Sequence, residues 1–210
     1  MSKEWVPGLE GIVAAESNIS FIDGQEGILE YRGFNIKTLA DNCTFEEAAY
    51  LLLEGSLPTP GALEAFSADL VANREISPAV LGFLRSLPAE GHPMKAIQAG
   101  CAVLGAEHGM TDLTDAGEAS KAIARLISQM PTIVAAFFRL RNGQEPVAPR
   151  KDLSHAANFL YMLDGEEPHP TLAKTMDVAL ILHMEHTMNA STFTGPVSYT
   201  HLTLPTICSV

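Results

Sequence analysis

Cysteine and basic side chains are both scarce in this chain. Its 210 residues include 3 cysteines, Cys43, Cys101 and Cys208, which are too widely spaced for a zinc-binding motif and too few for a disulfide framework. The 13 lysine and arginine residues are scattered and are outnumbered by 25 aspartate and glutamate residues, so the formal net charge is −12. Nucleic-acid binding needs clustered basic side chains, and we therefore expect no nucleic-acid partner.

Long hydrophobic runs are missing as well. The residues from Met1 to Pro7 contain no apolar stretch of the length found in signal peptides. No part of the chain approaches the roughly 18 consecutive apolar residues of a membrane-spanning helix. We therefore expect no membrane partner. Together with the reducing compartment that the few cysteines indicate, this predicts a cytoplasmic location.

The residues that are present form the pattern of a hairpin followed by helices. Apolar and polar residues alternate over 18–22 and 27–31 on either side of a glycine-containing loop, which predicts a β-hairpin. Thr44 and Glu47 have the spacing of a capping box for a helix that ends at Gly55. Helical periodicity then continues over 60–73, 78–87, 93–104, 117–140, 153–163 and 172–194. The fold class is therefore mainly α.

Two of these helices have features with more than one interpretation. The helix over 93–104 is rich in alanine and glycine, which favours close packing between helices. Pro131 falls inside the helix over 117–140 and should kink it or split it in two. Arg139 and Arg141 at its end could bind a carboxylate, but contact with the helix C-terminus and solvent is the simpler interpretation.

The last predicted helix carries two histidines. Its apolar positions recur at steps of three and four and define one face, which comprises Leu172, Met176, Ala179, Leu180 and His183. This periodicity places His183 and His186 on a face that is otherwise buried. A histidine there is often only a core residue, but Asn189 and three hydroxyl residues between 191 and 194 follow at once. So many polar groups at a helix end favour a binding site.

The segment 183–194, with the sequence HMEHTMNASTFT, resembles the substrate-binding helix of citrate synthases. Further similarity follows in the same order along the chain, in GLEGIVA (8–14), GIL (27–29), YRG (31–33), TFEE (44–47), LLL (51–53), LPT (57–59), HPM (92–94), MPTI (130–133) and NFLYM (158–162). No single run is diagnostic. Their order and spacing over residues 7–194 make the resemblance specific.

The resemblance implies a citrate-synthase-like fold. Residues 1–194 would be the N-terminal part of its multi-helical large domain, with an N-terminal β-hairpin, in a homodimer whose interface includes the region around 93–104. The implied activity is the condensation of acetyl-CoA with oxaloacetate to citrate and CoA in the tricarboxylic acid cycle. No cofactor is implied, because acetyl-CoA is a substrate.

The resemblance also implies site residues. His186 matches the family's oxaloacetate-binding histidine, and Asn189 is its neighbour in the pocket. An imidazole can donate a hydrogen bond to a carbonyl or carboxylate and, when protonated, stabilises a developing oxyanion. The histidine of the family's Leu-His-Gly-Gly motif, a second catalytic histidine, the aspartate base, the carboxylate-binding arginines and the CoA-binding segments are expected downstream of Thr194. We therefore expect no catalytic residue in this truncated chain, and no synthase activity from it alone.

Residues 195–210 have a separate interpretation. Gly195 and Pro196 break the helix that the family continues. The segment 197–206 resembles a translated sequencing-library adapter. We expect residues 195–210 to be a non-native tail that arose as a sequencing artefact, and a natural divergent C-terminus is the alternative.

Three further alternatives stay open. A 2-methylcitrate synthase, which uses propionyl-CoA, would share the fold, because one methylene provides only about 1 to 3 kcal/mol of discrimination. A metal-binding helical protein could use His183 and His186, although no third ligand is obvious. The chain could also be an inert fragment, with apolar faces that lack their packing partners and make it prone to aggregation or only partly folded.

The remaining histidines have weaker claims to a site. They are His92, His108, His155 and His169, and we expect His108 and His169 to be exposed.

Overall fold

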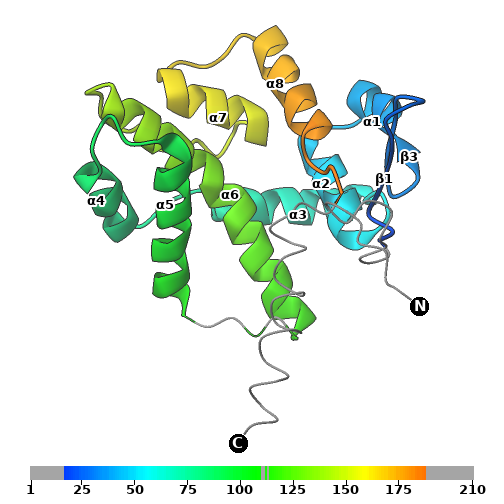
Figure 1. The fold of residues 1–210 in the computed structure, drawn as a ribbon, viewed down its shortest axis with the longest axis horizontal. Coiled ribbons are helices and arrows are strands. Elements are labelled where there is room, and N and C mark those ends of the chain that lie inside the picture. Colours follow the sequence, from blue (N-terminus) through cyan, green and yellow to red (C-terminus); the bar gives the residue numbers. More distant parts are fainter. Residues whose placement is uncertain (1–16, 110–111, 113, 188–210) are drawn as a thin grey trace, which may run out of the picture.

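A computed structural model describes residues 17–109, 112 and 114–187, and within them a small sheet is followed by helices (Figure 1). The strands are β1 (Ser20–Asp23), β2 (Ile28–Tyr31) and β3 (Phe34–Asn35). The helices are α1 (Ile36–Asn42), α2 (Phe45–Glu54), α3 (Pro60–Ala72), α4 (Pro78–Ser86), α5 (Pro93–His108), α6 (Ala116–Arg141), α7 (His155–Asp164) and α8 (Pro170–Leu182). The prediction of a mainly α fold with an N-terminal β-hairpin is confirmed.

The predicted hairpin is extended by a second one. Strand β1 pairs antiparallel with β2, with Ser20 opposite Tyr31, and β2 then pairs with β3. Only Arg32 and Gly33 connect β2 to β3, and both have positive φ, 49° and 82°, as a two-residue type I′ turn requires. Strand β3 was not predicted, because an Arg-Gly pair lacks the asparagine or aspartate that usually marks such a turn. The short helix α1 was not predicted either.

Polar side chains define where the helices begin. The side chain of the residue before each helix accepts a hydrogen bond from a backbone N–H of the first turn, and these residues are Asn35, Thr44, Thr59, Ser77, His92, Asp115, Ser154 and His169. The predicted capping box is confirmed, since Thr44 and Glu47 each bond the other's backbone N–H. Gly55 ends α2 in the left-handed conformation, as predicted.

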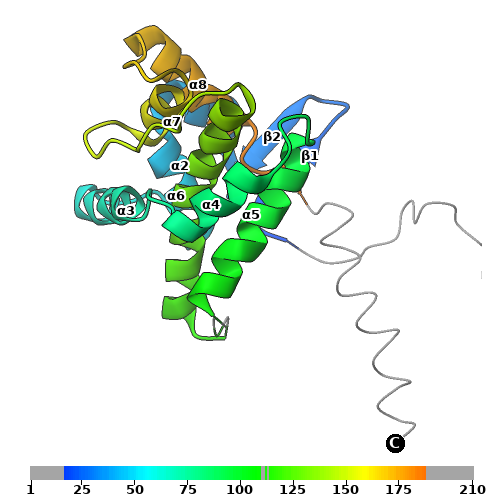
Figure 2. The same cartoon turned by 90° about the vertical axis from the view of Figure 1, so that its left-hand side faces the viewer.

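Helix α6 forms the centre of the larger core. It packs against α3, α4, α5 and α7, and α5 runs along it in both views (Figures 1 and 2). The buried side chains of this cluster are Val80, Leu84, Ala96, Leu104, Ile133, Ala136 and Phe137. Gly100 of α5 faces Ile133 so closely that an added Cβ would lie 3.1 Å from the Ile133 Cγ2 atom. The close packing predicted for the Ala- and Gly-rich helix is therefore confirmed.

The prediction that Pro131 splits the helix over 117–140 in two is wrong. Helix α6 runs unbroken from Ala116 to Arg141, and α3, α4, α5 and α7 pack against it. The half-buried side chain of Arg139 binds backbone carbonyl oxygens rather than a carboxylate. Its Nε and Nη1 atoms donate to the carbonyl oxygens of Glu145, at 2.6 Å, and Leu163, at 2.9 Å, and so attach the following loop and α7 to the end of α6.

Among the described helices, α6 alone is long and apolar enough to cross a membrane by length and composition. The core helix of a water-soluble protein passes the same test. Since 44% of the relevant window is buried inside the protein and α6 packs against four other helices, this feature is weak support for a membrane role.

A second, smaller core joins the two ends of the described chain. It contains Tyr31, Leu39, Ala48, Leu51 and Ile181, with Met184 packed against it. These residues come from β2, α1, α2 and α8, and Figure 1 shows the end of α8 next to α2 and the strands. The segment that carries the predicted binding histidines therefore starts from this core.

Candidate functional site

Helix α8 ends earlier than its periodicity predicts. It stops at Leu182, and the backbone N–H groups of His183 and Met184 bond back over three residues, to the carbonyl oxygens of Leu180 (3.3 Å) and Ile181 (3.4 Å). The chain then forms a turn, residues 183–187, which we call the histidine turn. The prediction of a helix over 172–194 is therefore wrong for residues 183–187, and its remainder lies outside the described residues.

The predicted buried face of α8 is only partly buried, since Met176, Ala179 and Leu180 are half-buried. The buried residues of this helix are Asp177 and Ile181, whereas Leu172, His183 and His186 are exposed. The periodicity was misleading because a charged residue, Asp177, faces inward. Exposure of both imidazoles is consistent with a binding role rather than a core role. Asn189, the other predicted binding residue, lies outside the described residues.

His183 has a defined orientation. Its Nδ1 atom lies 2.7 Å from the carbonyl oxygen of Ala179, one turn back in α8. Because a carbonyl oxygen can only accept, the hydrogen must be on Nδ1. The Nε2 atom of the neutral ring then has a free lone pair, and in the protonated ring it carries an N–H that can donate to an oxyanion.

Glu185, between the two histidines, anchors the histidine turn. Its backbone N–H donates to the hydroxyl oxygen of Tyr31 at 3.1 Å. One of its carboxylate oxygens accepts a hydrogen bond of 3.0 Å from the Ser20 hydroxyl and another from the Thr187 N–H. The turn is thus fixed to the N-terminal hairpin. The sequence singled out the YRG run and Glu185 only as parts of a resemblance, and this contact between them was missed.

Two buried carboxylates connect the first turn of α2 to α8 and α7. Asp177 of α8 accepts a hydrogen bond from the Phe45 N–H, and Glu46 accepts one of 2.9 Å from the His155 N–H. Both bonds satisfy N–H groups at helix starts that have no partner within the helix. The first turn of α2 therefore holds α7 and α8 together.

His155 is a structural residue. Its ring stacks on that of Phe45, with centroids 4.3 Å apart, and only 5% of the residue is exposed. Burial, reinforced by the positive charge of Arg74, lowers the pKa of His155 to about 4. The imidazole is therefore neutral at pH 7. Of the other histidines, His108 and His169 are exposed, as predicted, and His92 and His169 cap helix starts.

Arg74 fixes the loop before α7. It is buried, and its Nη1 atom donates to the carbonyl oxygens of Arg150 (2.6 Å) and Leu153 (2.9 Å). Burial lowers the pKa of the guanidinium, while the carboxylates of Glu46 and Asp152 oppose this change. The same residue accepts a hydrogen bond from Thr132 of α6 at its carbonyl oxygen. Arg74 thus connects α6 to the start of α7.

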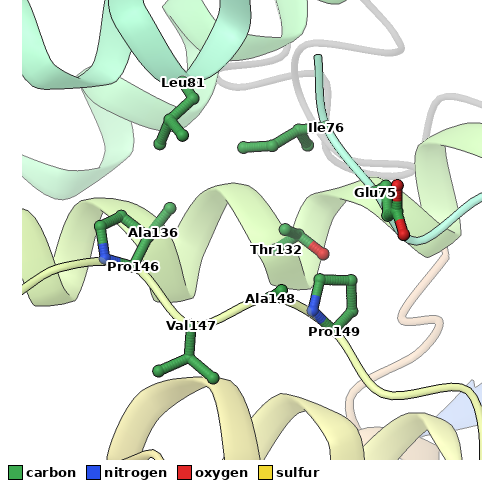
Figure 3. Close-up of a pocket in the computed structure, with 9 residues that line it drawn as sticks. All are labelled: Glu75, Ile76, Leu81, Thr132, Ala136, Pro146, Val147, Ala148 and Pro149. Atoms are coloured by element: carbon green, nitrogen blue, oxygen red, sulfur yellow. The ribbon is translucent and has the colours of Figure 1, made fainter. Parts of the chain in front are cut away.

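Two cavities of similar volume lie away from the histidine turn. The first, of about 290 Å³, is lined by residues 75, 76 and 81, by α6 and by the loop 146–149; Figure 3 shows Thr132 and Ala136 of α6 between Ile76 and this loop. The second, of about 280 Å³, lies between α5 and α6 and includes Cys101, His108 and Arg125. Neither cavity is lined by His183 or His186. The candidate site is a turn in which His183 and His186 are exposed and Met184 and Glu185 are half-buried.

The metal-binding alternative gains no support from the geometry. In residues 17–109, 112 and 114–187, no group of three or more histidine, cysteine, aspartate or glutamate side chains could hold a metal ion. The cysteines in that part of the chain, Cys43 and Cys101, are free thiols. A structural zinc site needs four such ligands.

Comparison with known proteins gives a consistent result. The family described as citrate synthase, C-terminal domain, matches residues 8–205. A citrate synthase from Acidithiobacillus ferridurans is 48% identical over 206 residues, which cover 96% of this chain and 53% of the relative. The chain spans about half the length of the curated relatives it matches.

Solved structures agree with the sequence comparison. The crystal structure of a citrate synthase from Pyrobaculum aerophilum superimposes with a TM-score of 0.81 at 40% identity, over 93% of this chain and 51% of that one. A 2-methylcitrate synthase from Mycobacterium tuberculosis is more distant, at 38% identity over 90% of this chain and 48% of the relative. The predicted citrate-synthase-like fold is therefore confirmed.

Proposed function

Because the chain belongs to the citrate synthase family, we propose that it is part of a citrate synthase, which condenses acetyl-CoA with oxaloacetate to citrate and CoA. The observation that carries the proposal is the 48% identity to a citrate synthase over nearly the whole chain. The exposed histidine turn, fixed to the smaller core through Glu185, supports it. We also propose a cytoplasmic homodimer, in line with the sequence-based expectations.

His186 binds oxaloacetate in this proposal, and Asn189 completes that side of the pocket. A hydrogen bond from the imidazole to the ketone or a carboxylate of oxaloacetate orients the substrate and polarises the carbonyl. The enol or enolate of acetyl-CoA can then attack that carbonyl carbon. The groups that remove the methyl proton and bind CoA belong to the half of the protein beyond this chain, so the 210-residue polypeptide alone is inactive.

A 2-methylcitrate synthase is the second candidate, supported by the 38% identity to such an enzyme. The two reactions share oxaloacetate and differ by one methylene in the acyl-CoA, so the residues proposed here would serve either. The higher identity to a citrate synthase favours acetyl-CoA. Parallel assays with acetyl-CoA and propionyl-CoA on the extended protein distinguish the two functions.

The role of His186 is tested by oxaloacetate binding. The gene is first sequenced across the codons for residues 193–197 and outward, since continuation of the reading frame into a Leu-His-Gly-Gly segment would identify residues 195–210 as an artefact and provide the extended protein. Calorimetric titration of that protein with oxaloacetate should show binding that His186→Ala weakens at least tenfold. His169→Ala, another exposed histidine, is the control and should bind as the unsubstituted protein does. Equal affinity for both variants would refute the assignment.

A further inference from the structure

We infer that Tyr31 is a positioning residue for the oxaloacetate site: its hydroxyl holds the backbone of the histidine turn, and with it His186, in the orientation that binds substrate. Tyr31 lies on β2, 150 residues before Ile181 in the chain. It does not need to touch the substrate to act. The effect on substrate affinity rests on the function proposed for His186, whereas the effect on the turn does not.

The ring of Tyr31 cannot readily move. None of its surface is exposed, and it belongs to the smaller core with Leu39, Leu51 and Ile181. Side chains in such a core are packed as closely as molecules in an organic crystal. The position of the hydroxyl oxygen is therefore set by the core and not by the turn that it contacts.

The Tyr31 hydroxyl contacts one backbone atom at the end of α8 and two in the histidine turn. Its oxygen lies 3.0 Å from the carbonyl oxygen of Ile181 and 3.1 Å from both the carbonyl oxygen and the nitrogen of Glu185. A hydroxyl has one hydrogen and two lone pairs. It accepts from the Glu185 N–H and donates to one carbonyl at a time. The pKa of Tyr31 is raised by burial, so the donor hydrogen is retained at neutral pH.

These hydrogen bonds replace those of a continued helix. The last carbonyl groups of α8 have no N–H partner four residues on, and the Glu185 N–H is taken by Tyr31 instead of by Ile181. The Tyr31 hydroxyl thus bonds both groups that a continued helix would pair with each other, the Ile181 carbonyl oxygen and the Glu185 N–H. His186 is the next residue after Glu185, so its backbone position follows from this contact.

Ser20 adds a second attachment from the same hairpin. It is directly opposite Tyr31 in the β1–β2 pair, which places the two side chains on one face of the sheet. Its hydroxyl donates to the Glu185 carboxylate at 3.0 Å. One pair of cross-strand neighbours therefore binds the backbone and the side chain of a single residue in the turn.

Hydrogen exchange in the 210-residue chain tests the positioning directly. Tyr31→Phe keeps the ring and removes the hydroxyl, and the Glu185 amide should then exchange at least about tenfold faster. Amides of the core segment of α6 around Ile133 should keep their rates. Tyr50→Phe is the matched control, because it removes a hydroxyl from a ring of α2 that packs edge-on against Phe66 of α3. Unchanged exchange at Glu185 in Tyr31→Phe, or equal acceleration in α6, would overturn the inference.

Kinetics of the extended protein test the consequence for substrate. Tyr31→Phe should raise the KM for oxaloacetate about tenfold, the effect of one lost hydrogen bond, and leave the KM for acetyl-CoA within about twofold. Ser20→Ala should raise the KM for oxaloacetate less than Tyr31→Phe does. If the exchange result holds but the unsubstituted protein has no oxaloacetate-dependent activity, the proposed function fails and the role of Tyr31 in the turn stands. If activity is present and Tyr31→Phe leaves both KM values unchanged, Tyr31 does not position the site.

Discussion

The carboxylate of Asp177 accepts a hydrogen bond of 2.9 Å from the backbone N–H of Phe45, although 132 residues separate the two in the chain. Phe45 is the first residue of α2, and its N–H has no partner inside that helix. The other carboxylate oxygen of Asp177 contacts the Lys174 ammonium at 3.2 Å. A side chain of α8 thus pairs a free N–H at the start of α2. The contact attaches to α2 the helix that leads into the histidine turn.

Removing this acceptor should destabilise the fold. Asp177→Leu leaves the buried N–H of Phe45 without a partner, which costs about 1–3 kcal/mol. Asp177→Asn keeps an acceptor oxygen of the same shape and should lose less. Denaturant unfolding of the three proteins measures the difference, and equal stability of the Leu and Asn variants would show that the hydrogen bond contributes little.

Stability should fall in mild acid because of His155. The unfolded state takes up a proton near pH 6.5, whereas the folded state holds the pKa of His155 at about 4. Protonation therefore favours unfolding: the stability is complete above pH 6.5 and declines as the pH drops toward 4. The loss from this group is on the order of 3 kcal/mol over that interval.

The contribution of His155 can be isolated by substitution. His155→Phe keeps a ring that can stack on Phe45 and should flatten the decline between pH 6.5 and 4, measured by urea unfolding at several pH values. His108→Gln removes an exposed histidine at the end of α5 and should leave the decline as it is. A profile for His155→Phe as steep as that of the unsubstituted chain would contradict the low pKa.

Two glycines within helices should respond differently to alanine. An added Cβ at Gly82 of α4 meets nothing within 4 Å, so Gly82→Ala should stabilise by about 0.5–1 kcal/mol through helix propensity. At Gly100 the same change places a Cβ 3.1 Å from Ile133 and should bring no such gain. Gly100→Leu should cost about 1–3 kcal/mol through overpacking. Thermal unfolding compares the three, and a gain at Gly100 equal to that at Gly82 would show that α5 and α6 are loosely packed.

The 210-residue chain should associate with itself. Large apolar side chains are exposed on several elements, among them Met94 (63%), Phe21 (55%) and Leu172 (48%), and such surfaces promote association. Light scattering after gel filtration should detect oligomers or aggregates. The double substitution Phe21→Gln and Met94→Gln should shift the sample toward monomer. A monodisperse monomer with a cooperative thermal transition would show that the isolated chain is a stable unit.

Much of the fold follows from local signals. The pairing of Thr44 with Glu47, the prolines that begin α3, α4 and α5, and Gly55 after α2 marked helix boundaries correctly, whereas α8 begins at Pro170, two residues before its predicted start. These signals lie within a few residues of the boundaries that they define. Of the two outcomes predicted for Pro131, a kink or a split, the split did not occur, because packing from four neighbouring helices outweighs the local preference.

The candidate site was less predictable for the same reason. The end of α8 depends on a hydroxyl from β2, far away in the sequence, and no pattern within residues 172–194 could reveal it. Asp177 broke the apolar periodicity because its carboxylate is needed at the start of α2. His186 was identified only through resemblance to a family, and Asn189 lies outside the described residues.

The most direct measurement is an assay of the extended protein, encoded by the gene as it continues beyond Phe193, for CoA release in the presence of oxaloacetate. We predict turnover with acetyl-CoA, a lower kcat/KM with propionyl-CoA, and none from the 210-residue chain under the same conditions. An extended protein that releases no CoA with either substrate would contradict the proposed function. A preference for propionyl-CoA would assign the protein to 2-methylcitrate synthesis, and turnover by the 210-residue chain itself would contradict the placement of the catalytic groups beyond it.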